Sequence, residues 1–339
     1  MQIRELIETL PKAELHVHLE GTLEPELSFA LAEKNGIALG YDTTEELLAA
    51  YDFHDLPSFL AIYYAAMNVL VDEDDFYRLA WQYLEKAASQ NIVYAELFFD
   101  PQAHTSRGVA FDTVIRGIHR AQEDAASKLG IETGLILCFL RDMSAQSAMQ
   151  HLELAVPYTD WLIGVGLDSD EKGNPPRKFA EVFARARSLG LKLTMHCDVN
   201  QDDTLEHMRQ VLEEIGVDRI DHGVNSLESE ALCTAIREKR LGLTVCPVSN
   251  RFVVQSLTSQ EIRAMLDKDM CVTINSDDPA YFRAYLNENF LELQEEGGFG
   301  EAEIVKLVLN GFDAAWIDEP TRSAYKDKVR SVIAAEAAS

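Results

Sequence analysis

Basic residues are scarce in this chain of 339 residues. Thirty Lys and Arg stand against 57 Asp and Glu, which gives a formal net charge of -27 at pH 7. Nucleic acids and anionic membranes bind to cationic surfaces, so we expect neither as a partner. Large anionic substrates are disfavoured for the same reason, unless a local basic pocket overrides the total charge.

Long apolar runs and paired cysteines are missing as well. No run approaches the roughly 18 apolar residues of a membrane-spanning helix. The five cysteines are odd in number and none forms a CxxC pair, which is typical of reduced thiols in the cytoplasm. Arg4, Glu5 and Glu8 stand too early for the apolar core of a signal peptide. We therefore expect a cytoplasmic protein that does not enter a membrane.

The composition is that of a globular protein. Apolar residues make up 47 % of the chain and charged residues 26 %, so the chain can bury a large core. The length allows two domains. No linker, repeat or low-complexity tract marks a border, however, and we predict a single domain over residues 1–339.

Short apolar or β-branched runs alternate with longer helical patterns along the chain. This alternation indicates a parallel sheet, and eight such units predict a closed (β/α)8 TIM-type barrel. A doubly wound open sheet is the alternative, but it usually carries a Gly-rich first turn, which is absent here. The eight predicted strands cover 14–19, 92–99, 134–140, 162–168, 191–196, 218–222, 242–246 and 270–275.

A helical insertion separates the first two predicted strands. The last six strands begin about 24–29 residues apart, as repeated strand–helix units require, whereas the first gap is about 78 residues. Because residues 20–72 follow strand 1, we expect them to form a lid over the carboxyl-terminal mouth of the barrel. Their aromatic side chains would line the pocket, although packing against the barrel rim explains them equally well. Further helices are predicted over 24–35, 43–50, 56–70, 280–296, 301–314 and 319–336.

Polar residues at strand ends carry the chemistry of barrel enzymes. His16 and His18 are two residues apart in strand 1 and therefore share a face, while His196, His222 and Asp277 fall at the ends of strands 5, 6 and 8. Three imidazoles and a carboxylate suit a divalent cation such as zinc, with a position open for water. We assign His16, His18, His196 and Asp277 as ligands and His222 as a base beside the metal. Taken singly, each histidine would be explained as well by a structural role.

Four segments resemble the adenosine/adenine deaminases of the amidohydrolase superfamily. They follow the family order over almost the whole chain and read PKAELHVHLEGTLEPEL (11–27), TMHC around His196, RIDHG (219–223) and INSDDP (274–279). The resemblance implies a distorted (β/α)8 barrel that holds one Zn2+ through the four ligands above. It also implies that His222 orients and deprotonates the attacking water, with Asp277 helping to orient it. Asp278 would bind the purine at N7, and His18 would border the substrate.

The segment after strand 4 bears on the choice of purine. It reads GVGLDSDEKGNPPRKF (164–179) and resembles the adenine-deaminase branch, whose members act on the free base. Asp168, Asp170 and Glu171 are candidates to contact the N3/N9 edge, because a bare adenine carries an N–H there that a carboxylate accepts. A solvated acidic loop or a helix N-cap explains these residues equally well.

One position departs from the family pattern. The family has H-A-G-E after strand 5, where the glutamate protonates purine N1, whereas this chain has HCDV with Val199 in place of the glutamate. Loss of a general acid typically costs on the order of 10²–10⁴ in rate. Three interpretations stay open. Asp198 supplies the proton, or the substrate needs less help at N1 or obtains the proton from another group such as Asp170, Glu171 or Asp202, or activity is lost and a purine-binding protein remains.

The expected reaction is hydrolytic deamination at C6 of a 6-aminopurine base, giving a 6-oxopurine plus ammonia or an amine. Val199 makes the N1/N6 side of the pocket more apolar, so adenines with an alkyl group on N6 are a second substrate hypothesis. An adenosine deaminase remains an alternative. A different metal-dependent hydrolase is another, but the bridging lysine of many two-metal barrels is missing from strand 4. A homo-oligomer is compatible with the sequence.

Overall fold

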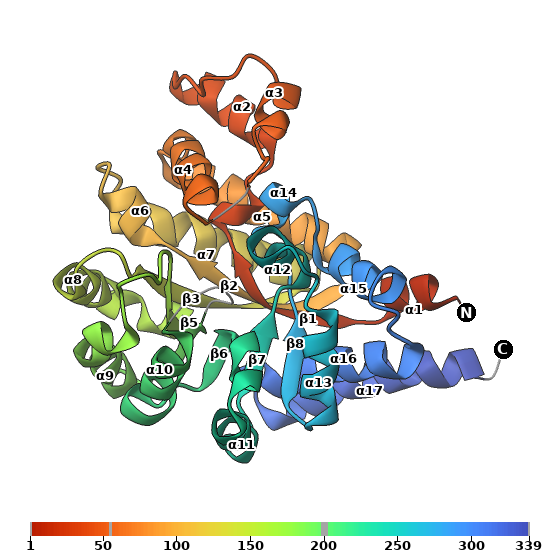
Figure 1. Cartoon of the computed structure of the whole chain (residues 1–339). Helices are drawn as coiled ribbons and strands as arrows, with labels where there is room; N and C mark the ends of the chain where they lie inside the picture. Colours follow the sequence, from red (N-terminus) through yellow and green to blue (C-terminus); the bar gives the residue numbers. More distant parts are fainter. Residues whose placement is uncertain (1, 54–55, 198–202, 338–339) are drawn as a thin grey trace.

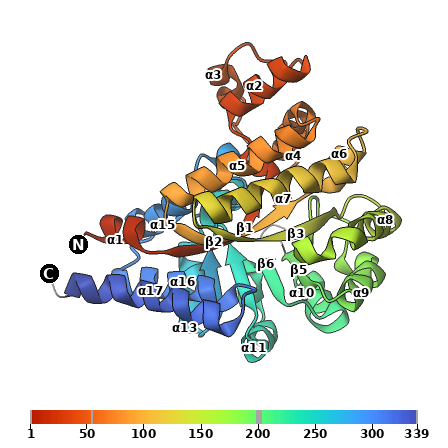
Figure 2. The same ribbon diagram turned by 180° about the vertical axis from the view of Figure 1, so that it is seen from behind.

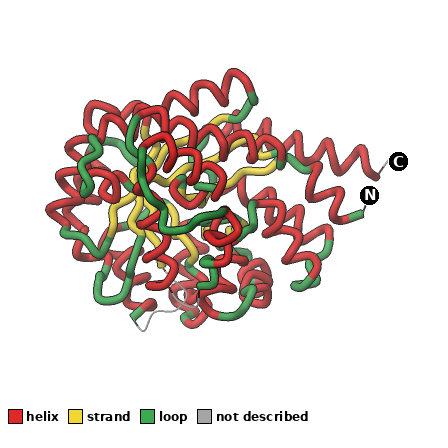
Figure 3. The backbone as a smooth tube through the Cα atoms, turned by 90° about the horizontal axis from the view of Figure 1, so that it is seen from above, coloured by secondary structure: helices red, strands yellow, loops and turns green. Residues whose placement is uncertain are grey.

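Eight parallel strands follow one another around the sheet in chain order. The computed structural model describes residues 2–53, 56–197 and 203–337. Seen from above, the strands lie inside a layer of helices (Figure 3), so the predicted (β/α)8 barrel is confirmed. The strands are β1 (Lys12–His18), β2 (Ile92–Phe99), β3 (Glu132–Leu140), β4 (Leu162–Asp168), β5 (Lys192–Cys197), β6 (Arg219–His222), β7 (Gly242–Val245) and β8 (Cys271–Ile274).

Helices cover the outside of the barrel (Figure 1). The two termini lie close together on the same side of the molecule, as both side views show (Figures 1 and 2). No helix in the described parts of the chain is both long enough and apolar enough to cross a bilayer. The helices are α1 (Ile3–Thr9), α2 (Pro25–Asn35), α3 (Thr44–Ala49), α4 (Leu56–Ala66), α5 (Glu73–Ser89), α6 (Pro101–Thr105), α7 (Phe111–Lys128), α8 (Ala145–Ala155), α9 (Ala180–Ser188), α10 (Thr204–Arg209), α11 (Glu230–Lys239), α12 (Pro247–Val254), α13 (Ser259–Asp267), α14 (Pro279–Phe282), α15 (Leu286–Glu295), α16 (Glu301–Ala314) and α17 (Glu319–Ala337).

The barrel closes between β1 and the segment that follows β8. The Asp277 N–H donates to the His16 carbonyl at 3.1 Å, and the His18 N–H donates to the Asp277 carbonyl at 2.9 Å. One residue earlier in β1, the Leu15 N–H donates a hydrogen bond of 2.8 Å to the Asn275 side-chain oxygen, which takes the place of a backbone carbonyl. Three of the predicted site residues are therefore fixed by the backbone bonds that close the barrel.

The insertion after β1 stands above the carboxyl ends of the strands (Figures 1 and 2). Its helices α2, α3 and α4 match the three predicted helical patterns, and a short 3₁₀ helix, Met67–Val69, follows α4. The insertion contacts the segment after β8, where the Tyr51 and Tyr281 rings stack with centroids 4.8 Å apart. Its use as a lid stays a prediction.

One helix prediction was wrong in detail. The pattern over 280–296 forms two helices, α14 and α15, instead of one. The chain turns at Arg283, which has a left-handed φ of 54° and ends α14. The Arg283 guanidinium donates to the Leu48 carbonyl in the insertion, a long-range contact that local periodicity cannot predict.

A small apolar cluster lies apart from the main core and beside the site. It contains Phe98, Ile136 and Cys138, all fully buried. The Phe98 ring centroid lies 5.0 Å from that of His16 and 5.1 Å from that of His18. The two imidazoles therefore pack against an apolar surface, which limits the directions in which their nitrogens can point.

Candidate metal and purine site

Four side chains from three parts of the barrel converge at its carboxyl end. His16, His18, His196 and Asp277 are all buried, and one ligating atom of each lies within 4.8 Å of the others. His18 Nε2 is 3.2 Å from His196 Nε2, and His16 Nε2 is 3.2 Å from Asp277 Oδ1. The structure thus brings together the four residues predicted to be ligands.

Hydrogen bonds outside the cluster set the tautomers of two of these histidines. Thr244 Oγ1 donates to Asp221 Oδ1 at 2.8 Å and accepts from His16 Nδ1 at 2.9 Å. His196 Nδ1 donates to the Leu167 carbonyl, which can only accept, at 3.1 Å. Both Nε2 atoms therefore present lone pairs to the cluster, as partners outside the cluster do for metal-binding histidines.

These lone pairs face other acceptors at short range. His16 Nε2 is buried, has no hydrogen-bond partner and points at the Asp277 carboxylate. Two acceptors at such a distance repel each other unless a proton or a metal cation lies between them. The donor set, three imidazole nitrogens and one carboxylate oxygen, is one that borderline divalent cations accept. The residues present therefore fit a metal ion.

The ionisation states agree with that fit. Burial lowers the pKa of His18 to about 4, and burial together with the neighbouring imidazoles holds the pKa of His196 well below its usual value. The surrounding histidines, against the opposing effect of burial, hold the pKa of Asp277 well below the ordinary range. At neutral pH these three groups are deprotonated, the state that binds a metal. In His16 the Asp277 carboxylate outweighs the opposing effect of burial and raises the pKa, so a metal would take the place of the proton between these two residues.

His222 lies at the end of β6, beside the cluster. Its ring centroid is 4.8 Å from that of His16 and 5.2 Å from that of His196, and its Nε2 is 3.9 Å from Asp277 Oδ2. Burial, followed by the charge of His16, lowers the pKa of His222 to about 4. A neutral imidazole in this position can accept a proton, as the predicted role requires.

Asp168 and Asp278 lie next to the cluster. Asp168 ends β4, and its Oδ2 is 3.4 Å from His18 Nδ1. Asp278 follows Asp277, and its Oδ1 is buried without a hydrogen-bond partner. A Cβ at Gly21 would come within 2.0 Å of that oxygen, so only glycine at position 21 leaves room for the carboxyl. Burial, then the charge of Asp277, raises the pKa of Asp278 well above its ordinary value.

Glu171 and Asp170 have protein partners instead. Glu171 is fully buried, with Oε1 2.5 Å from His207 Nδ1 and Oε2 3.4 Å from Arg141 Nη1. Asp170 is half-buried and accepts the Lys172 N–H at 3.0 Å. Their predicted contact with the purine stays a prediction, as does the proton-donor role considered for each. Asp198, Val199 and Asp202 lie outside the described residues.

Several polar residues support the site without having been singled out from the sequence. Ser249 Oγ donates to Asp277 Oδ2 at 2.6 Å. Glu20 accepts from His104 Nε2 at 2.8 Å and from the Asp100 N–H at 3.1 Å. Asp100 directly follows β2, so the strand-end rule that selected Asp168 applies to it equally. Ser249 lies on a helix after β7, where that rule gives no signal.

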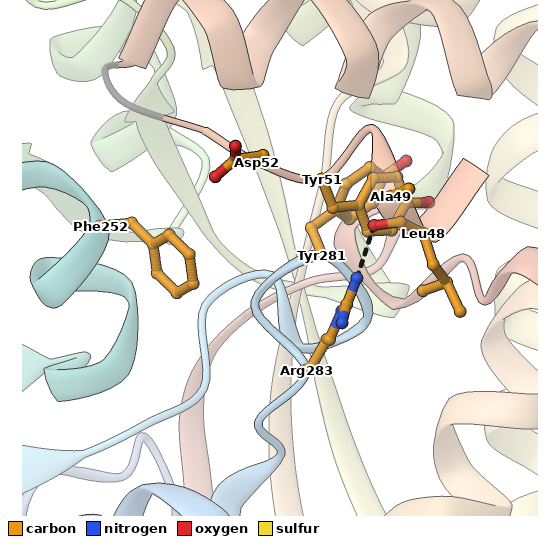
Figure 4. A pocket seen from close by; sticks show the side chains of 7 residues that line it. All are labelled: Leu48, Ala49, Tyr51, Asp52, Phe252, Tyr281 and Arg283. Carbon is orange, nitrogen blue, oxygen red and sulfur yellow. Dashed lines mark hydrogen bonds between the residues drawn. The ribbon is translucent and has the colours of Figure 1, made fainter. Parts of the chain in front are cut away.

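A hollow lies between the insertion, α12 and α14. Tyr51 and Tyr281 stack along one side of it, and the Arg283 guanidinium donates to the Leu48 carbonyl (Figure 4). None of the four clustered residues lines it. The lining residues are Leu48, Ala49, Tyr51, Asp52, Phe252, Tyr281 and Arg283.

The barrel and the cluster at its carboxyl end define the class, that of the amidohydrolase-type (β/α)8 barrels. The chain belongs to the adenosine deaminase family, whose model matches residues 11–332. It is a hydrolytic deaminase that acts on C–N bonds and falls in the adenine-deaminase-like branch of that family.

Curated relatives and solved structures are similar over nearly full length. A deaminase of Schizosaccharomyces pombe is 50 % identical, covering 98 % of each chain. The adenine deaminase of Acinetobacter baylyi is 46 % identical over 98 % of this chain and 100 % of its own. The crystal structure of adenine deaminase from Arthrobacter aurescens has a TM-score of 0.92 at 40 % identity, covering 96 % of this chain and 99 % of that one. An amidohydrolase of Burkholderia ambifaria with bound Zn has a TM-score of 0.89 at 26 % identity, covering 99 % and 95 %.

Proposed function

We propose that this protein is a zinc-dependent adenine deaminase, which hydrolyses free adenine at C6 to hypoxanthine and ammonia. The observation that carries the proposal is the convergence of His16, His18, His196 and Asp277 beside His222. Relatives at 46 % and 45 % identity over nearly the whole chain are adenine deaminases. The TM-score of 0.92 to an adenine deaminase supports the same substrate class.

His16, His18, His196 and Asp277 would hold one Zn2+. When bound, the ion supplies a water activated for attack near neutral pH. His222, neutral and next to Asp277, would accept a proton from the attacking water. Asp277, whose carboxylate accepts a hydrogen bond from Ser249, would help to orient that water, and Asp278 would bind the ring at N7.

The proton for N1 needs a source other than position 199. Glu171 is a buried carboxylate whose charge acts on His222, and Asp198 is the adjacent acid in sequence. Asp170, which follows β4 in the sequence, and Asp202, which follows β5, are the other acids considered as donors. Replacing Val199 with Glu tests whether that position limits the rate. A rise in turnover of adenine indicates that the present donor is weaker than a glutamate, and an unchanged rate indicates that another group already supplies the proton.

Adenines alkylated on N6 are the second candidate substrates. Position 199 holds Val where the family pattern has Glu, and an apolar residue there would favour an N6-alkyl group, whose burial contributes roughly 25 cal/mol per Å². The aromatic rings of Phe53, Phe59 and Tyr63 form a contiguous group above the barrel, with neighbouring centroids 5.3 Å and 5.0 Å apart. In this reaction an amine leaves instead of ammonia.

A substrate panel followed by ultraviolet absorbance tests the proposal. Adenine, adenosine, N6-methyladenine and N6-methyladenosine are compared at equal concentrations with zinc-loaded protein, and metal content is measured on the same sample. Adenine is expected to have the highest kcat/KM, with N6-methyladenine the next best. A higher kcat/KM for adenosine overturns the free-base assignment. Binding of hypoxanthine without turnover of any 6-aminopurine identifies a binding protein instead.

A further inference from the structure

Two carboxyl groups face one another between His18 and the insertion. Asp100 follows β2 and Asp168 ends β4, so they come from strands on either side of β3. Asp100 is 2 % exposed and Asp168 is 3 % exposed. One oxygen of each lies within 4.8 Å of a His18 nitrogen and of the other. Their backbone positions are fixed by the strands and, for Asp100, by the bond from its N–H to Glu20.

Both carboxyls have oxygens that the protein leaves without a donor. Asp100 Oδ1 and both oxygens of Asp168 are buried without a hydrogen-bond partner of ordinary geometry. Burial, followed by the charge of Asp168, raises the pKa of Asp100 well above its usual value, so the two facing carboxyls share a proton and carry one negative charge at most near neutral pH. No lysine or arginine within the described ranges forms an ion pair with either residue. The two nearby arginines have other partners, since Arg107 donates to His104 and Leu70 and Arg141 contacts Glu171 and the His196 carbonyl.

Burial of carboxyl oxygens without hydrogen-bond donors destabilises the empty site. The pair is therefore suited to an occupant that brings N–H donors. The insertion covers this region, because Tyr64 on α4 is hydrogen-bonded to Ser169, the residue after Asp168, with 2.9 Å between Oη and Oγ. The position of the pair next to His18 places it at the edge of the proposed substrate pocket.

We propose that Asp100 is a specificity-determining residue which, together with Asp168, accepts the ring N–H at the N3/N9 edge of a bare purine. The inference rests on the proposed function. Free adenine carries an N–H at N9, or at N3 in its other tautomer, whereas a 9-substituted adenine lacks it. A 9-substituent also brings apolar or sugar atoms against buried carboxyls that then stay unpaired. Sites built to bind an N–H or O–H reject analogues without it by large factors.

The experiment combines one conservative variant with a change in the ligand. Asp100→Asn keeps the shape of the side chain and removes one accepting oxygen, and Asp142→Asn makes the same charge change at an exposed neighbouring position. Zinc-loaded wild type and both variants are assayed with adenine, 9-methyladenine and adenosine, and KM and kcat are reported separately. Metal content and Tm establish that each variant is folded.

Asp100→Asn is expected to raise KM for adenine at least tenfold, as loss of a hydrogen bond to this charged pair of carboxyls does, with a smaller change in kcat. Its kcat/KM for 9-methyladenine stays close to wild type, so the preference for adenine falls at least tenfold. Asp142→Asn keeps the wild-type values. If Asp100→Asn keeps the wild-type KM and preference, the inference is wrong, although the proposed function stands.

Two further outcomes are also decisive. If wild type prefers adenosine to adenine, the proposed function itself fails. If Asp100→Asn does not fold, the inference is tested on the wild-type protein, by comparing its kcat/KM for adenine with its kcat/KM for 9-methyladenine. A loss of at least a hundredfold in kcat/KM on methylation supports the inference, and equal values overturn it.

Discussion

His222 and Asp277 share an uncommon backbone conformation. Both lie in the left-handed region, with φ of 58° and 67°, which non-glycine residues adopt rarely and at a cost. Backbone bonds to His16 and His18 hold Asp277 in this conformation. This conformation brings the His222 and Asp277 side chains together beside the other imidazoles. We therefore attribute the strained backbone to the needs of the site, since it does not stabilise the barrel.

The role of His222 is tested by its replacement. His222→Ala is expected to lower kcat for adenine by about 10²–10⁴-fold, since the base that accepts the proton of water is lost. Zinc content should stay at the wild-type value, because His222 is not among the four clustered ligands. The measurements are steady-state turnover and metal analysis of the same preparation. His119→Ala, a half-exposed residue stacked on Trp161, is the control and should leave both unchanged. Loss of zinc together with activity would identify His222 as a ligand.

At the scale of elements, α4 is connected to the barrel beside the proposed pocket. Tyr64 contacts Ser169, and the Phe59 ring stacks on that of Phe282 in α14 with centroids 5.2 Å apart. These contacts join the insertion to the loops after β4 and β8. If the insertion acts as a lid, we expect it to cover the site only while both contacts form.

Tyr64→Phe removes one hydroxyl and the hydrogen bond to Ser169. Such a bond between neutral groups contributes about 1 kcal/mol, so KM for adenine should rise about fivefold while kcat changes little. Tyr77→Phe, which removes the bond between Tyr77 and Asp124 on the outer helices, is the matched control. An unchanged KM in Tyr64→Phe, measured alongside that control, would contradict the role of α4 as a lid.

Lys12, at the amino-terminal end of β1, makes the stability of the fold depend on pH. Lys12 is buried and its Nζ donates to the Ile7 and Leu10 carbonyls at 2.7 Å and 2.6 Å. Burial lowers the pKa of Lys12 from 10.5 to about 7. Between these two pH values the unfolded chain binds more protons than the folded one, so the free energy of unfolding rises with pH, by at most about 1.4 kcal/mol per pH unit from this group. Below about pH 7 the group contributes no slope.

Lys12→Met should therefore flatten the rise of the unfolding free energy between pH 7 and pH 9. Denaturant unfolding at three pH values measures it, with the exposed Lys306→Met as control. The two carbonyls lose their donor while the cost of deprotonating Lys12 on folding is removed, so the stability of the variant relative to wild type should be lowest at pH 9 and rise toward pH 7. The same slope in Lys12→Met and wild type would show that Lys12 does not titrate in the folded state in this range.

Elements of the fold were predictable because their signals are local. The eight strands are short apolar runs, and His16, His18, His196 and Asp277 stand at strand ends, where a barrel must bring them together. The break at Arg283 and the bond from Ser249 to Asp277 depend on contacts far along the chain, which periodicity does not record. Asp100 could have been selected from the sequence, because it directly follows the predicted second strand. A single acid at a strand end has many structural explanations, however, and the position alone does not indicate a role.

At the scale of the whole molecule, the excess of acid is concentrated in part at the site. Glu20, Asp100, Asp168, Asp277 and Asp278 are all buried at the carboxyl end of the barrel. A bound cation would offset part of this charge and would also join β1, β5 and the segment after β8. The metal is therefore expected to stabilise the closed barrel as well as to serve catalysis.

Removal of the metal should lower Tm and abolish turnover together, because a ligand that binds only the folded state stabilises it. Dialysis against dipicolinate followed by calorimetry and an adenine assay measures both, and added zinc should restore both. A protein that keeps its Tm and its activity after the metal has been removed would have no structural or catalytic cation.

The most direct measurement is anomalous scattering at the zinc edge from crystals of the zinc-loaded protein with hypoxanthine. We expect one strong peak, surrounded by His16 Nε2, His18 Nε2, His196 Nε2 and Asp277 Oδ1, with the purine against Asp278 and its N3/N9 edge toward Asp100 and Asp168. A peak elsewhere, two peaks, or no peak among these four residues would contradict this expectation.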